Sequence, residues 1–229
     1  MIIAVANEKG GSGKTTLSVN LAIQFSMDKK EVLLLDTDPQ RSSEAFCNVR
    51  TNENKELSFH CLSKIGDSLA KEVKSLESKY DIIIIDTGGR DSKEMRLALT
   101  IADIVLIPLI PSQYDIMVLS KMNEIYEQAR VFNEKSKAYI IVTKASPNPF
   151  LQKKVDNLKT YIKEQKLENL SLMDSVIYER EAYRNAVEYG MGITEFCNES
   201  DKAYTDFMSL YKEIHNNMKW FKINHNVLC

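Results

Sequence analysis

The sequence has few of the residues that cross-link or interrupt a chain: four cysteines, five prolines and eight glycines among 229 residues. The cysteines, at positions 47, 61, 197 and 229, are widely separated and form no C-x-x-C pair. A disulfide framework or a zinc site is therefore not expected. A reducing cytosol is the simplest setting for such a chain.

Long hydrophobic runs and an excess of one charge are also missing. The longest apolar stretch, 101–110, is interrupted by Asp103 and Pro108 and is too short to cross a bilayer. The chain starts directly with a strand-like run, so no signal peptide is expected. With a net charge of −2, any nucleic-acid binding must depend on a local patch. The length and the 44% apolar content predict one globular domain over residues 1–229.

Three of the eight glycines stand together, in the stretch Lys9-Gly10-Gly11-Ser12-Gly13-Lys14-Thr15-Thr16. An apolar run, 1–6, precedes this stretch, and a helical pattern from Thr15 to about Met27 follows it. Strand, glycine-rich turn and helix are the context of a phosphate-binding loop, whose N–H groups and helix dipole bind an anion. Lys14 is then placed to reach the β- and γ-phosphates, and Thr15 to place its hydroxyl on Mg²⁺.

This loop departs from the usual G-x-x-x-x-G-K-[ST] pattern. Glu8 occupies the position of the first glycine, and a second lysine, Lys9, precedes the glycine pair. K-G-G-x-G-K-T is the deviant Walker A signature, and the region resembles the ParA/MinD family of P-loop ATPases. The resemblance implies that Lys9 crosses a dimer interface to contact the partner's nucleotide. The alternative is a solvated surface lysine beside an ordinary phosphate loop.

Two carboxylates end the next apolar run, in Asp36-Thr37-Asp38-Pro39-Gln40. Alternate positions on a strand share one face, so both carboxylates are expected beside the phosphate loop at the carboxyl edge of a parallel sheet. A polar turn after a core strand is the alternative. The D-x-D-P-Q pattern resembles the family's second motif. That resemblance implies that Asp36 helps to hold the Mg²⁺ water shell and that Asp38 positions or activates the attacking water.

A third carboxylate, Asp86, ends the strongest apolar strand, 80–86. A strand capped by Asp has the Walker B form, in which Asp86 reaches Mg²⁺, through water in our interpretation. The segment Thr87-Gly88-Gly89-Arg90 replaces the Asp-x-Pro-Pro of many family members. Its glycines predict a mobile loop that senses the γ-phosphate, or else a plain strand-to-helix turn. Arg90 is a candidate phosphate or dimer contact.

The remaining pattern predicts the fold. Strand-like runs at 104–109 and 139–143 alternate with helical patterns at 63–77 and 115–132, which gives a doubly wound, mostly parallel α/β sheet flanked by helices. A C-terminal helical segment is expected at about 199–222. The loop 144–149 lies where relatives hold the adenine. It lacks the Asn-Lys-x-Asp motif of GTPases, so that ATP, rather than GTP, follows from the resemblance.

Two segments near the C-terminus bear on partners. Arg180 and Arg184 lie one helical turn apart and are candidate contacts to a DNA phosphate backbone. A surface face of ion pairs with neighbouring glutamates is the alternative. The tail 218–223 mixes bulky apolar and basic residues, as membrane-binding tails do. It is short and carries only two lysines, so a helix end that closes over the core is favoured over membrane binding.

The resemblance is to small ParA-type proteins, since no N-terminal DNA-reading domain is expected. It implies a cytoplasmic, nucleoid-associated ATPase that uses ATP and Mg²⁺ and forms a homodimer around the nucleotide. It also implies non-specific DNA binding and stimulation by a ParB-like partner, in the partition of a plasmid or chromosome. A MinD-like membrane-cycling regulator and a metabolic ATPase of the same superfamily are the alternatives.

Overall fold

The computed structural model describes residues 1–165 and 167–225, and the side chains of these residues except 113–116 and 225. Within them the chain forms a seven-stranded sheet in the order β3-β2-β4-β1-β5-β6-β7. All strand pairs are parallel. The strands are β1 (Ile2–Val5), β2 (Val32–Asp36), β3 (His60–Ser63), β4 (Ile82–Asp86), β5 (Ile104–Leu109), β6 (Lys137–Ala145) and β7 (Leu170–Tyr178).

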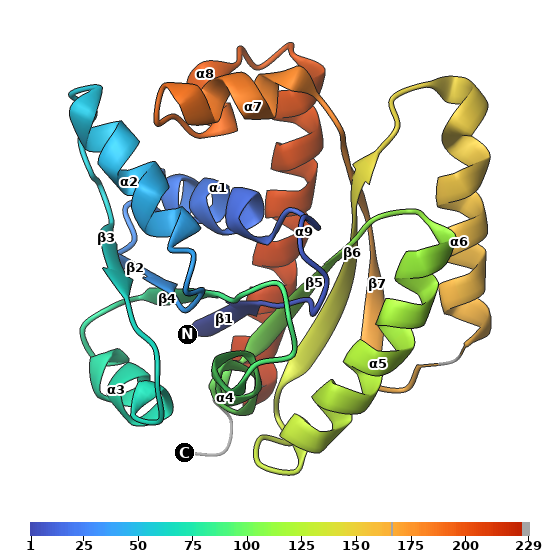
Figure 1. The fold of residues 1–229 in the computed structure, drawn as a ribbon, viewed down its shortest axis with the longest axis horizontal. Helices are drawn as coiled ribbons and strands as arrows, with labels where there is room; N and C mark the ends of the chain where they lie inside the picture. The colour runs from blue at the N-terminus through green and yellow to red at the C-terminus, as the bar shows by residue number, and fades with distance from the viewer. Residues whose placement is uncertain (166, 226–229) are drawn as a thin grey trace.

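Helices cover both faces of this sheet (Figure 1). One face packs against α3 to α6, and the other packs against α1, α2, α8 and α9. The helices are α1 (Lys14–Met27), α2 (Ser42–Asn52), α3 (Leu69–Leu76), α4 (Lys93–Ile101), α5 (Gln113–Arg130), α6 (Gln152–Glu164), α7 (Glu181–Glu188), α8 (Ile193–Phe196) and α9 (Lys202–His225), with a 3₁₀ turn, η1, at Pro149–Leu151. The predicted doubly wound α/β class is confirmed.

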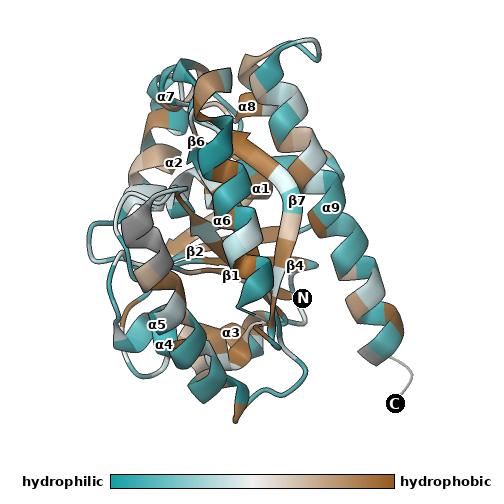
Figure 2. Ribbon diagram, turned by 90° about the vertical axis from the view of Figure 1, so that its right-hand side faces the viewer, coloured by the Kyte–Doolittle hydropathy of each residue, from teal (hydrophilic) through white to brown (hydrophobic). Residues whose placement is uncertain are grey.

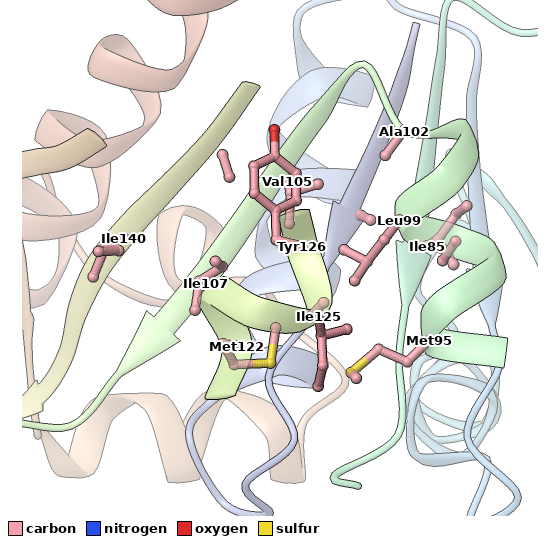
Figure 3. Close-up of a cluster of buried hydrophobic side chains, with 14 of the residues drawn as sticks. Ile85, Met95, Leu99, Ala102, Val105, Ile107, Met122, Ile125, Tyr126 and Ile140 are labelled. Atoms are coloured by element: carbon pink, nitrogen blue, oxygen red, sulfur yellow. The ribbon is translucent and has the colours of Figure 1, made fainter. Parts of the chain in front are cut away.

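The central strands are buried on both faces, which explains their nearly continuous apolar sequences. Every residue of β2 and β4 is buried, including the terminal aspartates. Figure 3 shows how the sheet meets α4 and α5: Met95 and Leu99 of α4 and Met122 and Tyr126 of α5 pack over the strands. Figure 2 shows the same arrangement at the scale of the molecule. The strands in the interior are mostly hydrophobic, and the helices around them carry many hydrophilic residues.

The prediction of one helix over 63–77 is wrong at its start. Ser63 ends the edge strand β3, and the helix begins only at Leu69. Gly66 adopts a left-handed conformation, with φ of 106°, in the turn between the two elements. Ile65, which fits the helical period in the sequence, is 43% exposed. The turn therefore overrides the apolar spacing.

Candidate functional site

The glycine-rich loop joins the end of β1 to the start of α1. Gly13 is the N-cap of α1 and has φ of 96°, and Gly11 has φ of 76°. Residues with a side chain rarely adopt these left-handed angles, so the two glycines permit the turn. The loop is also held by β6, because the Thr143 hydroxyl donates to the carbonyl of Ser12 at 2.8 Å. The predicted phosphate-binding loop therefore has the expected strand–turn–helix setting.

Lys14 folds back over this loop. Its Nζ donates to the carbonyl of Lys9 at 3.0 Å, and the side chain is only 6% exposed. Burial lowers the pKa of Lys14, and the carboxylates of Asp86 and Asp38 partly oppose that effect. A buried ammonium with one carbonyl partner gains from meeting an anion. The Ser12 hydroxyl, also buried, has no hydrogen-bond partner within the described part of the chain.

Asp86 lies at the centre of a cluster of hydroxyl groups. Its carboxylate accepts from Thr15 at 2.7 Å, from Ser43 at 2.8 Å and from Ser18 at 3.1 Å. The side chain is fully buried, and this burial raises the pKa of Asp86 to about 6, although the hydroxyls lower it in part. The structure thus brings Thr15 and Asp86, two predicted Mg²⁺ residues, into direct contact.

Asp36 stands beside Asp86, because the two residues are paired in register on β2 and β4. Its carboxylate accepts from the backbone N–H groups of Asp38 at 2.9 Å, Ser43 at 2.8 Å and Glu44 at 3.3 Å. Asp36 therefore orders the start of α2 as well as facing the site. Burial raises its pKa, and these backbone donors act in the opposite direction.

The donor set fits Mg²⁺ held together with a nucleotide. Mg²⁺ usually takes one or two carboxylates, water and phosphate oxygens rather than a complete protein cage. Thr15, Asp36 and Asp86 supply oxygens of this kind at one edge of the sheet. Among the described residues no group of three or more His, Cys, Asp or Glu forms a metal cage. A Mg²⁺ ion here would therefore need the phosphates of the nucleotide as further ligands.

A cavity of about 530 Å³ opens over the loop, and we call it the phosphate cavity. Asp38 and Gly89 line it together with the loop glycines. Asp38, which is half-buried, is held by a hydrogen bond from the Gln40 N–H at 3.0 Å. The full lining is Gly10, Gly11, Gly13, Lys14, Thr15, Thr16, Asp38, Pro39, Gln40, Ser42, Thr87, Gly89, Arg90 and Lys144.

A second cavity, of about 360 Å³, lies on the other side of Gly13, and we call it the side cavity. Gly13, Thr16 and Lys144 line both cavities, so the two are adjacent. The side cavity is walled mainly by residues of α1, β7 and α7. These include Leu17, Asn20, Ile177, Tyr178, Tyr183 and Val187, and Phe207 of α9 adds to them. The Tyr183 hydroxyl is buried, and no described residue gives it a hydrogen bond.

Arg180 and Arg184 lie on the wall of this side cavity. Arg180 pairs with Asp206 at 2.7 Å and lies over the ring of Tyr178, 5.3 Å from its centroid. Arg184 pairs with Glu179 at 2.8 Å and is 75% exposed. The ion pair with Glu179 agrees with the alternative given for these arginines. Their contact with DNA stays a prediction.

The comparisons with known proteins agree with this geometry. The family model described as "CobQ/CobB/MinD/ParA nucleotide binding domain" matches residues 3–193. The chain belongs to this family. Over 213 residues it is 25% identical to the "Maintenance of carboxysome distribution protein A" of Halothiobacillus neapolitanus, covering 93% of this chain and 95% of that protein. Over 193 residues it is 28% identical to "Protein ParA" of Rhizobium radiobacter, covering 82% and 83%.

The fold of this ParA/MinD-family chain also has solved counterparts. A putative plasmid partition protein from Borrelia burgdorferi bound to AMPPNP matches with a TM-score of 0.74, over 94% of this chain and 98% of that one. The two share 20% sequence identity, so the likeness concerns the fold. The resemblance inferred from the Lys9–Thr16 loop is thus confirmed at the level of family and fold.

Sequence reasoning missed several residues of the site. Ser18 and Ser43 bind Asp86, and Thr143 braces the loop, yet no motif marked them. Ser18 does lie one helical turn beyond Thr15 on the same face of α1, which is the only local signal for it. Ser43 and Thr143 reach the site through the topology of the sheet.

Proposed function

We propose that this ParA/MinD-family protein is a ParA-like partition ATPase, which binds ATP with Mg²⁺ and hydrolyses it slowly. The observation that carries the proposal is the contact of Thr15 with Asp86 beside Lys14, directly under a glycine loop that starts with Lys9. Lys14 would bind the β- and γ-phosphates, and Mg²⁺ held by Thr15, Asp36 and Asp86 would offset phosphate charge. Gly10, Gly11, Ser12, Gly13 and Thr16 would supply the surrounding N–H and hydroxyl groups.

In this proposal Asp38 orients the attacking water at the open side of the phosphate cavity. Its half-buried position beside the loop supports this role. Phosphoryl transfer depends mainly on the positions of the reacting groups and on the stabilisation of charge in the transition state. A site that lacks one cation therefore hydrolyses ATP slowly. Lys9 of a second copy would supply that cation, which makes hydrolysis depend on a nucleotide-bound homodimer.

The side cavity would hold the base of the nucleotide. It adjoins the phosphate cavity at Gly13, and its lining is mostly apolar with an unpartnered Tyr183 hydroxyl. Purine rings bind between apolar walls with few polar contacts, which supports this assignment. ATP, rather than another triphosphate, rests on the family.

Downstream, the ATP-bound dimer would bind DNA without sequence preference, through Arg180 and Arg184, and would be released when a ParB-like protein stimulates hydrolysis. In this proposal the protein would act in the cytoplasm, on the nucleoid. Size-exclusion chromatography with light scattering tests the scheme, with no nucleotide, ADP or AMPPNP, each with Mg²⁺. We expect the mass to double only with AMPPNP, and DNA to co-elute only with that species. A monomer under all three conditions would contradict the proposal.

A MinD-like, membrane-cycling ATPase is the second candidate. The last turns of α9 expose Trp220, at 50%, and Ile223, at 67%, beside the exposed Lys222. Against it, Met218 and Phe221 of the same turns are buried, which leaves a narrow apolar edge. None of the described helices has the length and apolar character needed to span a membrane. Sedimentation with anionic liposomes and AMPPNP separates the candidates, because only the MinD-like protein would pellet without DNA.

A further inference from the structure

The loop after β4, Thr87-Gly88-Gly89-Arg90, lies against both of the other phosphate-site motifs. A Cβ atom added to Gly89 would stand 2.7 Å from the Cα of Gly10 and 3.6 Å from Nζ of Lys14. A Cβ atom added to Gly88 would stand 3.4 Å from the carboxyl carbon of Asp38. Both positions are therefore in close contact with the residues that would bind and hydrolyse the nucleotide. The absence of a side chain at Gly89 is what permits its close approach to Gly10.

The loop is fixed at both of its ends. On the β4 side, the N–H and hydroxyl of Thr87 both donate to the carbonyl of Val5, at 3.2 and 3.0 Å. On the α4 side, Asp91 is bound by Arg96 through two hydrogen bonds of 2.7 and 2.8 Å. The Ser92 side chain accepts from the N–H of Met95 and caps α4. Only Gly88, Gly89 and Arg90 remain between these anchors.

Arg90 is the cation that this loop brings to the phosphate cavity, whereas Arg96 lies in α4 and is engaged by Asp91. No described residue forms an ion pair or hydrogen bond with the Arg90 side chain, which is exposed on the cavity wall. The adjacent carboxylate, Asp91, is satisfied by Arg96. Arg90 thus lines the same cavity as Lys14, and it follows Gly89, whose backbone lies against Gly10.

We propose that Arg90 binds the terminal phosphate of the nucleotide in its own subunit and so distinguishes a triphosphate from a diphosphate. Gly89 lies over Gly10 and beside the Nζ of Lys14, the group that would bind the β- and γ-phosphates, so the residue that follows Gly89 stands near the end of the phosphate chain. A guanidinium can bind two phosphate oxygens at once, a geometry that a lysine lacks. Binding there would couple the terminal phosphate to the position of the 87–90 loop and, through Gly88, to Asp38.

The inference rests on the proposed nucleotide site, and calorimetry can test the two separately. AMPPNP and ADP, each with Mg²⁺, are titrated into the wild type and into Arg90→Ala, Arg90→Lys and Lys93→Ala. Lys93 is the matched control, because it lies three residues further on, pairs with Asp67 and is not among the residues that line the phosphate cavity. Arg90→Ala should bind AMPPNP about tenfold or more weakly and ADP within about twofold of the wild type. Arg90→Lys should fall between, and Lys93→Ala should match the wild type.

Several outcomes would overturn the inference. Equal losses for both nucleotides would make Arg90 a general phosphate or structural contact, and no loss would remove it from the site. Unchanged AMPPNP binding with a lost dimer would move its contact to the partner subunit. If the wild type itself binds neither nucleotide, the proposed function fails. Thermal unfolding of each variant, expected to match the wild type because Arg90 is exposed, confirms that the comparison concerns folded protein.

Discussion

Asp86 is a carboxylate that the fold buries completely, at the end of the inner strand β4. Three hydroxyl donors stabilise its charge, yet burial dominates and raises its pKa to about 6. An aspartate in an unfolded chain has a pKa of about 3.9. The two pKa values make the free energy of unfolding depend on pH, because they set the pH at which the folded and the unfolded protein each bind this proton.

Replacement of Asp86 by Asn tests this effect. Between about pH 4 and pH 6 the unfolded state has lost the proton of Asp86 while the folded state still holds it, so the wild type loses stability as pH rises. The loss reaches on the order of 3 kcal/mol above pH 6, where it levels off. We expect Asp86→Asn to gain stability relative to the wild type over that range. Urea unfolding at a series of pH values, with EDTA and without nucleotide, measures it.

The control for that series is Asp67→Asn, in an exposed carboxylate that pairs with Lys93. The difference in free energy of unfolding between this variant and the wild type should change little between pH 4 and pH 6, since exposed ion pairs contribute little to stability. A stability difference for Asp86→Asn that does not vary with pH would show that Asp86 is ionised throughout.

Lys14 offers a second prediction at this scale. Its ammonium is buried with one carbonyl partner, so the charge contributes to binding an anion more than to folding. The affinity of Lys14→Ala for both AMPPNP and ADP should fall by at least about a hundredfold, because charge-assisted contacts to two phosphates disappear. The free energy of unfolding should stay the same or rise. Calorimetry and urea unfolding measure the two quantities, and near-normal affinity would refute the phosphate-loop assignment.

At the scale of elements, Arg50 joins α2 to the segment that carries α7 and α8. Its guanidinium forms two hydrogen bonds of 2.8 Å with Glu195 and a third with the carbonyl of Gly190. The residue is 4% exposed, and a Cβ atom on Gly190 would lie 2.3 Å from the Cα of Arg50. The first turn of α2 donates backbone N–H groups to the Asp36 carboxylate, so the Arg50 contact links the edge of the sheet that carries Asp36 to the segment of α7 and α8.

Removal of one partner tests this link. Arg50→Ala should lower the free energy of unfolding by about 3–5 kcal/mol, because Glu195 then keeps a largely buried charge without its partner. Arg184→Ala is the matched control, since its ion pair with Glu179 is exposed on both sides and should contribute less than about 1 kcal/mol. Urea unfolding measures both, and similar losses for the two variants would contradict a structural role for the Arg50 contact.

At the scale of the whole molecule, Lys9 is the residue on which the proposed dimer depends. The carbonyl of Lys9 accepts from Lys14, and its N–H donates to Asn7 at 2.9 Å, so the backbone at this position belongs to the loop of its own subunit. The proposed function assigns its side chain to the nucleotide of a second copy. A change of the Lys9 side chain should therefore affect dimer formation and leave nucleotide binding by the single subunit largely intact.

Lys9→Ala should therefore bind AMPPNP within about threefold of the wild type but fail to double its mass. Light scattering after size-exclusion chromatography measures the mass, and calorimetry measures the affinity. Lys9→Arg, which keeps the charge, should retain part of the dimer. Wild-type dimerisation of Lys9→Ala would show that the lysine has no role across the interface.

Local sequence patterns were sufficient for much of this protein. The glycine loop, the buried strands and the aspartates that end them are encoded within a few neighbouring residues, because turn angles and strand burial are local requirements. The parallel order then follows from the alternation of strands and helices. The start of α3 was not predictable, since Gly66 and the pairing of β3 with β2 compete with the helical spacing.

Tertiary structure decided the contacts between distant segments. Ser43 reaches Asp86, Arg50 reaches Glu195, and Gly89 lies on Gly10 only because the sheet places these segments side by side. A sequence pattern states what a residue is suited to bind, whereas burial and the neighbours across the sheet determine which partner it meets. The sequence therefore specified the edge of the sheet that is proposed to bind phosphate, and the packing of its layers determined which hydroxyls, glycines and cations complete that edge.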